Sequence, residues 1–294
     1  MKPAAFDYYA PTSVEEALDR LAELGYSGKV LAGGQSLIPA MNFRMARPAA
    51  LVDLNNIAEL DYIKSTKEGG LAIGTMTRDS VVEHSKVVQE KAPLVVEAMP
   101  NIGHPQIRNR GTFGGAIAHA DPAGQLPGIS LALRAKLHLL KKGSDRWVDI
   151  DNFFVGPFMT VIEPDEILSE AVFPPQPAKT GTSYKQISRQ RGSATQSAIA
   201  SVVTLDDKGK VADVRVVMMS VGATPLVSME AEKLLMDQEP TEEVFKKVAK
   251  NASETEIDPS TDMHATADYR RHVTYELIIQ SLSCATARAK GKGG

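Results

Sequence analysis

A proline-rich segment just past the middle of the chain sets the strongest limit on how its 294 residues can fold. Residues 173–181 have the sequence FPPQPAKTG, in which three of the four positions from 174 to 177 are proline. Proline has no amide hydrogen and a fixed φ angle, so this run cannot continue a helix or lie within a central strand. We therefore expect the chain to divide here, with residues 176–294 as a C-terminal lobe.

Residues 1–54 predict a small α/β lobe. A helix is expected from Ser13 to Leu24, because Ser13 and Glu16 form a capping box and apolar residues then recur on one helical face. Gly25 follows at the position where a helix commonly ends with a positive φ angle. Short apolar runs predict strands at 29–32 and 51–54.

Residues 55–175 predict a second lobe, of the α+β class, with a mixed or antiparallel sheet. Its expected strands lie at 62–63, 71–74, 136–141, 147–150 and 166–172, and its expected helices at 77–87 and 93–99. After the proline-rich segment, two β-rich runs flank a turn at 206–210 and predict a hairpin. The expected helices of the C-terminal lobe lie at 228–236, 241–252 and 266–289.

Composition argues against several classes of function. Lys and Arg number 33 against 36 Asp and Glu, and this net charge of −3 argues against a nucleic-acid-binding protein, which is usually basic. The single cysteine, Cys284, excludes an internal disulfide, a Cys-rich zinc site and a four-Cys iron–sulfur cluster within this chain. The first residues lack the apolar core of a signal peptide, and no stretch is long and apolar enough to span a membrane. A cytoplasmic location is therefore expected.

Two glycine-rich segments are the main candidates for a binding site. They are Ala32-Gly33-Gly34-Gln35-Ser36 and Gly111-Thr112-Phe113-Gly114-Gly115. Paired glycines let a backbone approach a ligand closely, and successive free amides form a concave anion site. An ordinary tight turn is the commoner explanation of either pair alone. Neither segment matches the Rossmann fingerprint or the phosphate loop of ATPases, which disfavours both kinds of site.

Other polar groups carry weaker signals. His119 and Asp121 are two residues apart and suggest a metal site or a catalytic pair. No third ligand is near in sequence, so a hydrogen-bonded loop histidine is the preferred interpretation. Four arginines near the glycine-rich segments and in the C-terminal lobe either face phosphates or a partner or are solvated at the surface: Arg108, Arg110, Arg189 and Arg191.

Two longer motifs that contain the glycines resemble those of a known family. The motifs are KVLAGGQSLIPAMNFRMARP at 29–48 and IRNRGTFGGAIAHADPA at 107–123. Together with residues 3–8, 183–189 and 262–271, they resemble the medium, FAD-binding subunit of molybdenum hydroxylases of the aerobic carbon monoxide dehydrogenase and xanthine dehydrogenase type. The resemblance runs essentially from end to end of the chain.

This resemblance implies a fold and a cofactor site. The first two lobes would form an α+β, FAD-binding fold of the PCMH (vanillyl-alcohol oxidase-like) type, and the C-terminal lobe would pack a three-stranded antiparallel sheet on helices. FAD would lie between the first two lobes, and the chain would hold no catalytic or metal-binding residue. The implied FAD-binding residues are Ala32, Gly33, Gly34, Gln35, Ser36, Gly111, Thr112, Phe113, Gly114, Gly115, Leu168 and Lys185.

Three positions depart from the family's usual residues. Phe113 replaces an isoleucine or valine, and its ring is expected to pack on the flavin or narrow access to it. Gln125 lies where an aspartate often contacts FAD, which would change a charged contact into an amide one. Gln35 replaces a histidine found in carbon monoxide oxidisers, which favours an N-heteroaromatic or other organic substrate.

The resemblance also implies partner chains. A large subunit would carry the molybdenum cofactor and hydroxylate a small substrate or oxidise carbon monoxide. A small subunit would carry two [2Fe–2S] clusters, from which electrons pass to FAD on this chain, and the complex would be a dimer of heterotrimers. Two alternatives stay open: a stand-alone FAD-dependent oxidase or dehydrogenase, and a scaffold subunit that has lost its flavin.

Overall fold

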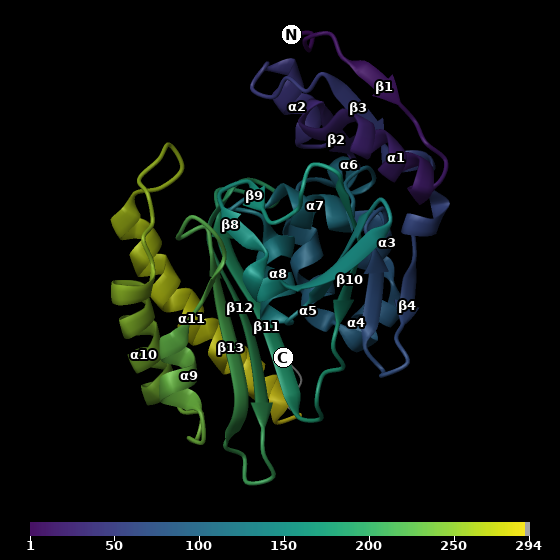
Figure 1. Cartoon of the computed structure of the whole chain (residues 1–294). Coiled ribbons are helices and arrows are strands. Elements are labelled where there is room, and N and C mark those ends of the chain that lie inside the picture. Colours follow the sequence, from purple (N-terminus) through teal and green to yellow (C-terminus); the bar gives the residue numbers. More distant parts are fainter. Residues whose placement is uncertain (292–294) are drawn as a thin grey trace.

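The computed structural model describes residues 1–291 (Figure 1). These residues form three apolar cores: one in the N-terminal lobe, one that fills the middle lobe and reaches one face of the C-terminal sheet, and one on the other face of that sheet. The N-terminal lobe has a parallel sheet in the order β1-β3-β2, with β1 at Asp7–Tyr9, β2 at Gly28–Leu31 and β3 at Ala50–Asp53. Helix α1 (Val14–Leu24) packs on this sheet, and α2 (Leu37–Asn42) follows the first glycine-rich segment. Strand β1 was not predicted, because three residues are too few to show a period.

The predicted start of α1 is confirmed, with one change in its capping. The Ser13 hydroxyl accepts a hydrogen bond from the Glu16 amide at 3.2 Å, as in a capping box. The Glu16 carboxylate, however, accepts from the Thr12 amide at 2.8 Å rather than from that of Ser13. Gly25 ends the helix with a φ of 50°.

The middle lobe contains a five-stranded sheet that is antiparallel throughout, in the order β4-β5-β10-β6-β7. Its strands are β4 (Ile63–Ser65), β5 (Leu71–Gly74), β6 (Lys136–Lys141), β7 (Ser144–Asp149) and β10 (Glu166–Phe173), and a small hairpin adds β8 (Phe154–Gly156) and β9 (Met159–Thr160). Short helices complete the lobe: α3 (Asp79–His84), α4 (Lys86–Lys91), α5 (Pro93–Ala98), α6 (Pro105–Arg108), α7 (Phe113–His119) and α8 (Gln125–Ala132). The single helix predicted over 77–87 is wrong, because Ser85 ends α3 and caps α4.

The C-terminal lobe is an antiparallel sheet covered by three helices (Figure 1). Its strands are β11 (Thr180–Ser188), β12 (Thr195–Leu205), β13 (Val211–Met219) and the two-residue β14 (Leu226–Val227), so a short fourth strand joins the three that were expected. Its helices are α9 (Met229–Leu235), α10 (Glu242–Asn251) and α11 (Ala267–Ala289), with a π-helical turn at 252–256. The predicted hairpin is confirmed as β12 and β13.

The central strand β12 is buried along its whole length, because both faces of the sheet are covered. Helix α11 lies against one face, and α8 of the middle lobe packs on the other. Residues of β12 and β13 accordingly belong to the same apolar core as Leu126 and Ile129 of α8. The proline-rich segment forms the connection from Phe173, where β10 ends, to Thr180, where β11 begins.

The close packing of α11 on β11 makes a testable prediction at Gly181. A Cβ atom there would overlap the backbone of Ala285 and Ala289, whereas a Cβ at Gly156 would make only an ordinary contact with Met159 at 3.8 Å. Gly181→Ala should destabilise the protein by about 1–3 kcal/mol, because overpacked cores must shift their backbone. Urea unfolding measures the loss, with Gly156→Ala as the matched control. Equal stability of the two variants would contradict this packing.

Candidate functional site

A cleft opens in the N-terminal lobe at the carboxyl ends of the parallel strands β2 and β3. Its volume is about 310 Å³. The ends of adjacent parallel strands are a common place for ligands, because the loops that leave them diverge. The cleft is lined by Leu31, Ala32, Gly33, Gly34, Gln35, Ile38, Pro39, Asn42, Asp53, Asn55 and Arg110.

The first glycine-rich segment forms one wall of this cleft with unused amides. Across residues 1–291, the backbone N–H groups of Gly33, Gly34, Gln35 and Ser36 donate to no protein acceptor. Gly34 has a φ of 75°, a conformation that favours glycine. The four N–H groups of this segment are therefore available to an anion, as in a backbone nest.

The second glycine-rich segment differs, because most of its amides are already used. Phe113 and Gly114 donate to the carbonyl oxygens of Thr77 (2.9 Å) and Thr75 (3.0 Å). The expected row of free amides is therefore wrong for this segment. One side-chain group of this segment is unused: the Thr112 hydroxyl is buried and has no hydrogen-bond partner within the described part of the chain. An orphaned buried hydroxyl is costly unless a ligand supplies the missing partner.

The two segments touch each other directly. A Cβ atom on Gly33 would collide with the Arg110 carbonyl and with the backbone of Gly111. A Cβ on Gly115 would lie 3.2 Å from that of Ala32. Glycine is needed here because two backbones pass closer than any side chain allows.

Two side chains, Asn55 and Arg78, join the segments across the lobes. Asn55 Nδ2 donates to the Ala32 carbonyl at 2.9 Å. Arg78 Nη2 donates to Asn55 Oδ1 at 2.6 Å, and Arg78 Nη1 donates to the Arg110 carbonyl at 2.6 Å. We call this pair the Asn55–Arg78 bridge. This bridge holds two carbonyl groups at fixed positions: that of Ala32, in the first segment, and that of Arg110, just before the second.

Asp53 anchors the bridge from below. Its carboxylate accepts hydrogen bonds from the backbone N–H of Asn55 at 2.9 Å and from the Tyr8 hydroxyl at 2.6 Å. The hydrogen bond to Asp53 raises the pKa of Tyr8. Four residues of this site were not predicted from the sequence: Asn42, Asp53, Asn55 and Arg78. For two of them the available signal was a polar residue near the end of the predicted strand at 51–54, Asp53, and another directly after it, Asn55, since ligand-facing groups often lie at the carboxyl end of a parallel strand.

The structure corrects the expectations for Phe113 and clarifies the position of Gln125. The Phe113 ring is fully buried and meets Phe173 edge-on at 6.0 Å, so the expected packing of this ring on a flavin is wrong. Gln125 Nε2 lies 3.1–3.3 Å from three internal acceptors, on Asn101, Gln186 and Thr195. The Gln125 amide thus holds the middle lobe to the C-terminal sheet.

Leu168 and Lys185 do not line the cleft. Leu168 is buried in β10 opposite Leu139, and Lys185 is half-buried in β11 opposite Ile199. Their roles in FAD binding stay predictions.

The structure places three other candidate polar residues, Arg108, Arg110 and His119, in different surroundings. Arg108 is buried and pairs with Glu83 (Nε to Oε2, 2.8 Å), so it faces no ligand, whereas Arg110 lines the cleft. His119 lies in the last turn of α7 rather than in a loop, where its ring packs on Phe158 and burial lowers its pKa. Within residues 1–291, no group of three or more His, Cys, Asp or Glu side chains is placed to hold a metal ion. In the same residues, no helix is both long and apolar enough to cross a membrane.

One buried carboxyl group lies beneath the second segment. Asp79 is only 3% exposed, and its Oδ1 has no hydrogen-bond partner in the described residues. Burial raises the pKa of Asp79 to about 7, although the cations of Arg108 and Arg78 oppose this shift. Its other oxygen occupies the space that a side chain at Gly111 would need.

Comparison with known proteins gives consistent matches along the chain. Residues 4–176 match the family described as the FAD binding domain in molybdopterin dehydrogenase, and residues 182–285 match the CO dehydrogenase flavoprotein C-terminal domain. The chain is 38% identical to the alpha subunit of the 6-hydroxypseudooxynicotine dehydrogenase complex of Paenarthrobacter nicotinovorans, with 99% of this chain and 97% of that subunit covered.

Solved structures agree with these matches. A carbon monoxide dehydrogenase from Hydrogenophaga pseudoflava, in a form that lacks the Mo-pyranopterin moiety of its cofactor, contains a chain with a TM-score of 0.94 and 36% identity, covering 98% of this chain and 99% of that one. Quinoline 2-oxidoreductase from Pseudomonas putida 86 has a TM-score of 0.91 at 27% identity, with 99% of each chain covered.

The buried carboxyl of Asp79 predicts a pH-dependent stability. Its pKa is about 7 in the folded chain against an ordinary value of 3.8, so between these pH values the folded state keeps a proton that the unfolded state has lost. The free energy of unfolding should therefore fall as pH rises from about 4 to 7, and this part of the fall should vanish in Asp79→Asn. Urea unfolding at a series of pH values measures it.

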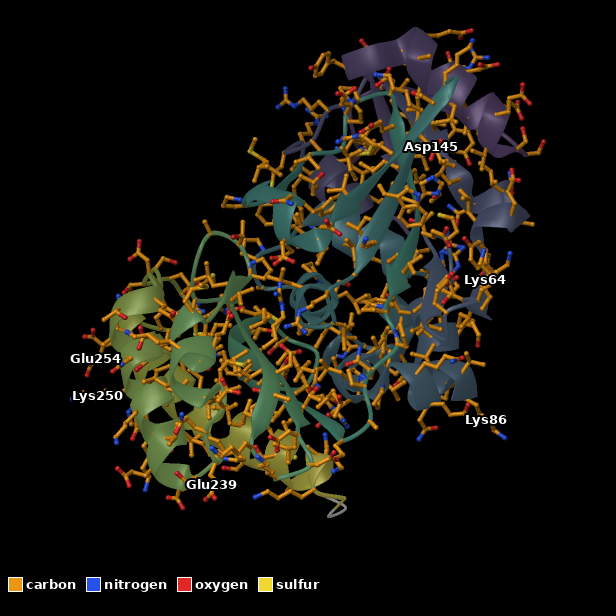
Figure 2. The ribbon with its side chains drawn as sticks, turned by 60° about the horizontal axis from the view of Figure 1, so that its bottom comes forward. Lys64, Lys86, Asp145, Glu239, Lys250 and Glu254 are labelled. Carbon is orange, nitrogen blue, oxygen red and sulfur yellow. The ribbon has the colours of Figure 1, made fainter. Side chains whose placement is uncertain are left out.

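Glu239→Gln is the control, because Glu239 is exposed on the C-terminal lobe (Figure 2). An identical pH profile for Asp79→Asn and the wild type would contradict the raised pKa.

Proposed function

This chain belongs to the FAD-binding medium subunits of the molybdenum hydroxylase family, and from that premise we propose that it holds FAD between its first two lobes through the two glycine-rich segments. The observation that carries the proposal is the row of four N–H groups from Gly33 to Ser36 that have no protein acceptor in residues 1–291. Three of them belong to residues that line the cleft, Gly33, Gly34 and Gln35. Each hydrogen bond to a charged phosphate oxygen contributes about 1.5–3 kcal/mol, so these amides suit a diphosphate.

The residues present fit this cofactor in a second way. The Thr112 hydroxyl, on the segment that contacts Gly33, is buried and has no hydrogen-bond partner among residues 1–291, so a bound group there would satisfy it. The Asn55–Arg78 bridge keeps both segments in place before the ligand arrives, which lowers the entropy cost of binding. Bound FAD would accept electrons from partner chains and deliver them to an external acceptor. The protein's part is to bind the cofactor, orient it and control access to it.

We further propose the partner subunits of this chain and the assembly that they form with it. A large subunit would carry the molybdenum cofactor, a small subunit would carry two [2Fe–2S] clusters, and two such heterotrimers would form a cytoplasmic dimer. The relatives named above include a dehydrogenase complex and a quinoline oxidoreductase. These names and the glutamine at position 35 favour a small organic, N-heteroaromatic substrate, hydroxylated on the large subunit.

The proposed site predicts that Gly33→Val abolishes FAD binding. A side chain at this position would push the first segment away from Arg110 and Gly111 and distort the row of amides. The flavin absorption bands that stay with the purified chain after added FAD is removed measure binding. Gly156→Ala, which lies outside the cleft, should keep them.

Bound flavin in Gly33→Val would contradict the proposed site. Bleaching of the isolated chain's flavin by an organic substrate would indicate a stand-alone oxidase or dehydrogenase instead of an electron relay. A chain that binds partner subunits but no flavin, alone or in the complex, would indicate a scaffold.

A further inference from the structure

Arg110 is a cation on the wall of the cleft that the fold does not use. Its side chain is exposed, and within residues 1–291 it forms no hydrogen bond and no ion pair. Arg108, two residues earlier, is its opposite, because that side chain is buried and paired with Glu83. Stability of the fold thus accounts for Arg108 and leaves Arg110 unexplained.

The main chain of Arg110 is held more firmly than its side chain. Its carbonyl accepts a hydrogen bond from Arg78 Nη1 at 2.6 Å and lies against Gly33. Arg78 is in turn fixed by Asn55, whose own amide reaches the Ala32 carbonyl. The Asn55–Arg78 bridge therefore presents the Arg110 side chain at the same cleft as the unused amides of the first segment.

The two guanidinium groups lie close enough to affect each other. Burial and the nearby Arg110 cation together lower the pKa of Arg78, and only the carboxylates of Asp61, Asp53 and Asp79 oppose this. Of these, Asp53 lines the cleft, but its carboxylate already accepts from Tyr8 and Asn55. An anion in the cleft would relieve this repulsion, since opposite charges at short range stabilise each other.

We propose that Arg110 binds the FAD diphosphate directly and supplies the positive charge that the backbone amides of Gly33–Ser36 lack. Arg78 and Asn55 are positioning residues, which act by holding the main chain of Arg110 against the first segment. This inference rests on the proposed function, because it names a further residue of the same cofactor site.

The test compares three variants of the full chain: Arg110→Gln, Arg110→Lys and Arg47→Gln. Arg47 is the matched control, since it is exposed on the N-terminal lobe, outside the cleft, and in the described part of the chain its side chain donates only to the Arg44 carbonyl. FAD is titrated into flavin-free protein at low and at high salt, and the dissociation constant is read from flavin fluorescence. The chain is used alone or with its co-purified partner subunits, whichever form of the wild type retains flavin.

The expected result is a dissociation constant raised about 10-fold or more in Arg110→Gln at low salt, because one charged contact is lost. The difference from wild type should shrink at high salt, since ions screen a charge–charge contact. Arg110→Lys should keep much of the affinity and the salt dependence of the wild type, and Arg47→Gln should match the wild type.

Two results would overturn the inference while leaving the proposed function intact. One is equal affinity of Arg110→Gln and Arg47→Gln for FAD at both salt concentrations. The other is a loss in Arg110→Gln that is the same at low and high salt and is not restored in Arg110→Lys, because that pattern indicates a structural role. A wild-type chain that binds no FAD, alone or with its partners, would contradict the proposed function itself.

Discussion

The contact between the backbone at Gly33 and the backbone at Arg110 and Gly111 is the constraint on which the site depends. At this point the N-terminal lobe meets the middle lobe with no side chain between them. The Asn55–Arg78 bridge then joins the two main chains by hydrogen bonds of 2.6–2.9 Å. Because the lobes are fixed here, the cleft beside the contact has a defined shape before any ligand binds.

The two glycine-rich segments use their backbone N–H groups differently, although each contains a pair of adjacent glycines. In residues 1–291, the N–H groups of Gly33 to Ser36 in the first segment have no protein acceptor, whereas those of Phe113 and Gly114 in the second donate to the carbonyl oxygens of Thr77 and Thr75. A bonded amide supports the fold, and a free one is available to a ligand. The second segment thus mainly supports the fold. Its Thr112 hydroxyl is buried and has no partner in residues 1–291, and Arg110, which directly precedes the segment, lines the cleft.

The C-terminal lobe is joined to the middle lobe by a shared core. Its sheet is covered by α11 on one face and by α8 on the other, where Gly128 leaves room for the Met219 side chain. Gln125, at the start of α8, adds hydrogen bonds to Gln186 and Thr195 of this sheet. The packing of the middle lobe and that of the C-terminal lobe therefore depend on each other, even though the proline-rich segment separates the two lobes in sequence.

Elements with local signals could be predicted from the sequence. The capped helices α1, α9, α10 and α11 and the β12–β13 hairpin each depend on residues within a few positions of one another. Likewise, the resemblance carried by the glycine-rich motifs identified the family. Other features became apparent only in the folded chain. Phe113 points into the core, Arg108 is paired whereas the Arg110 side chain has no partner among residues 1–291, and Asn55 and Arg78 connect the lobes. These interactions join residues about 20–60 positions apart, so no local pattern encodes them. Strand β1 and the short helices of the middle lobe could not be predicted for another reason, because they are too short to show a period.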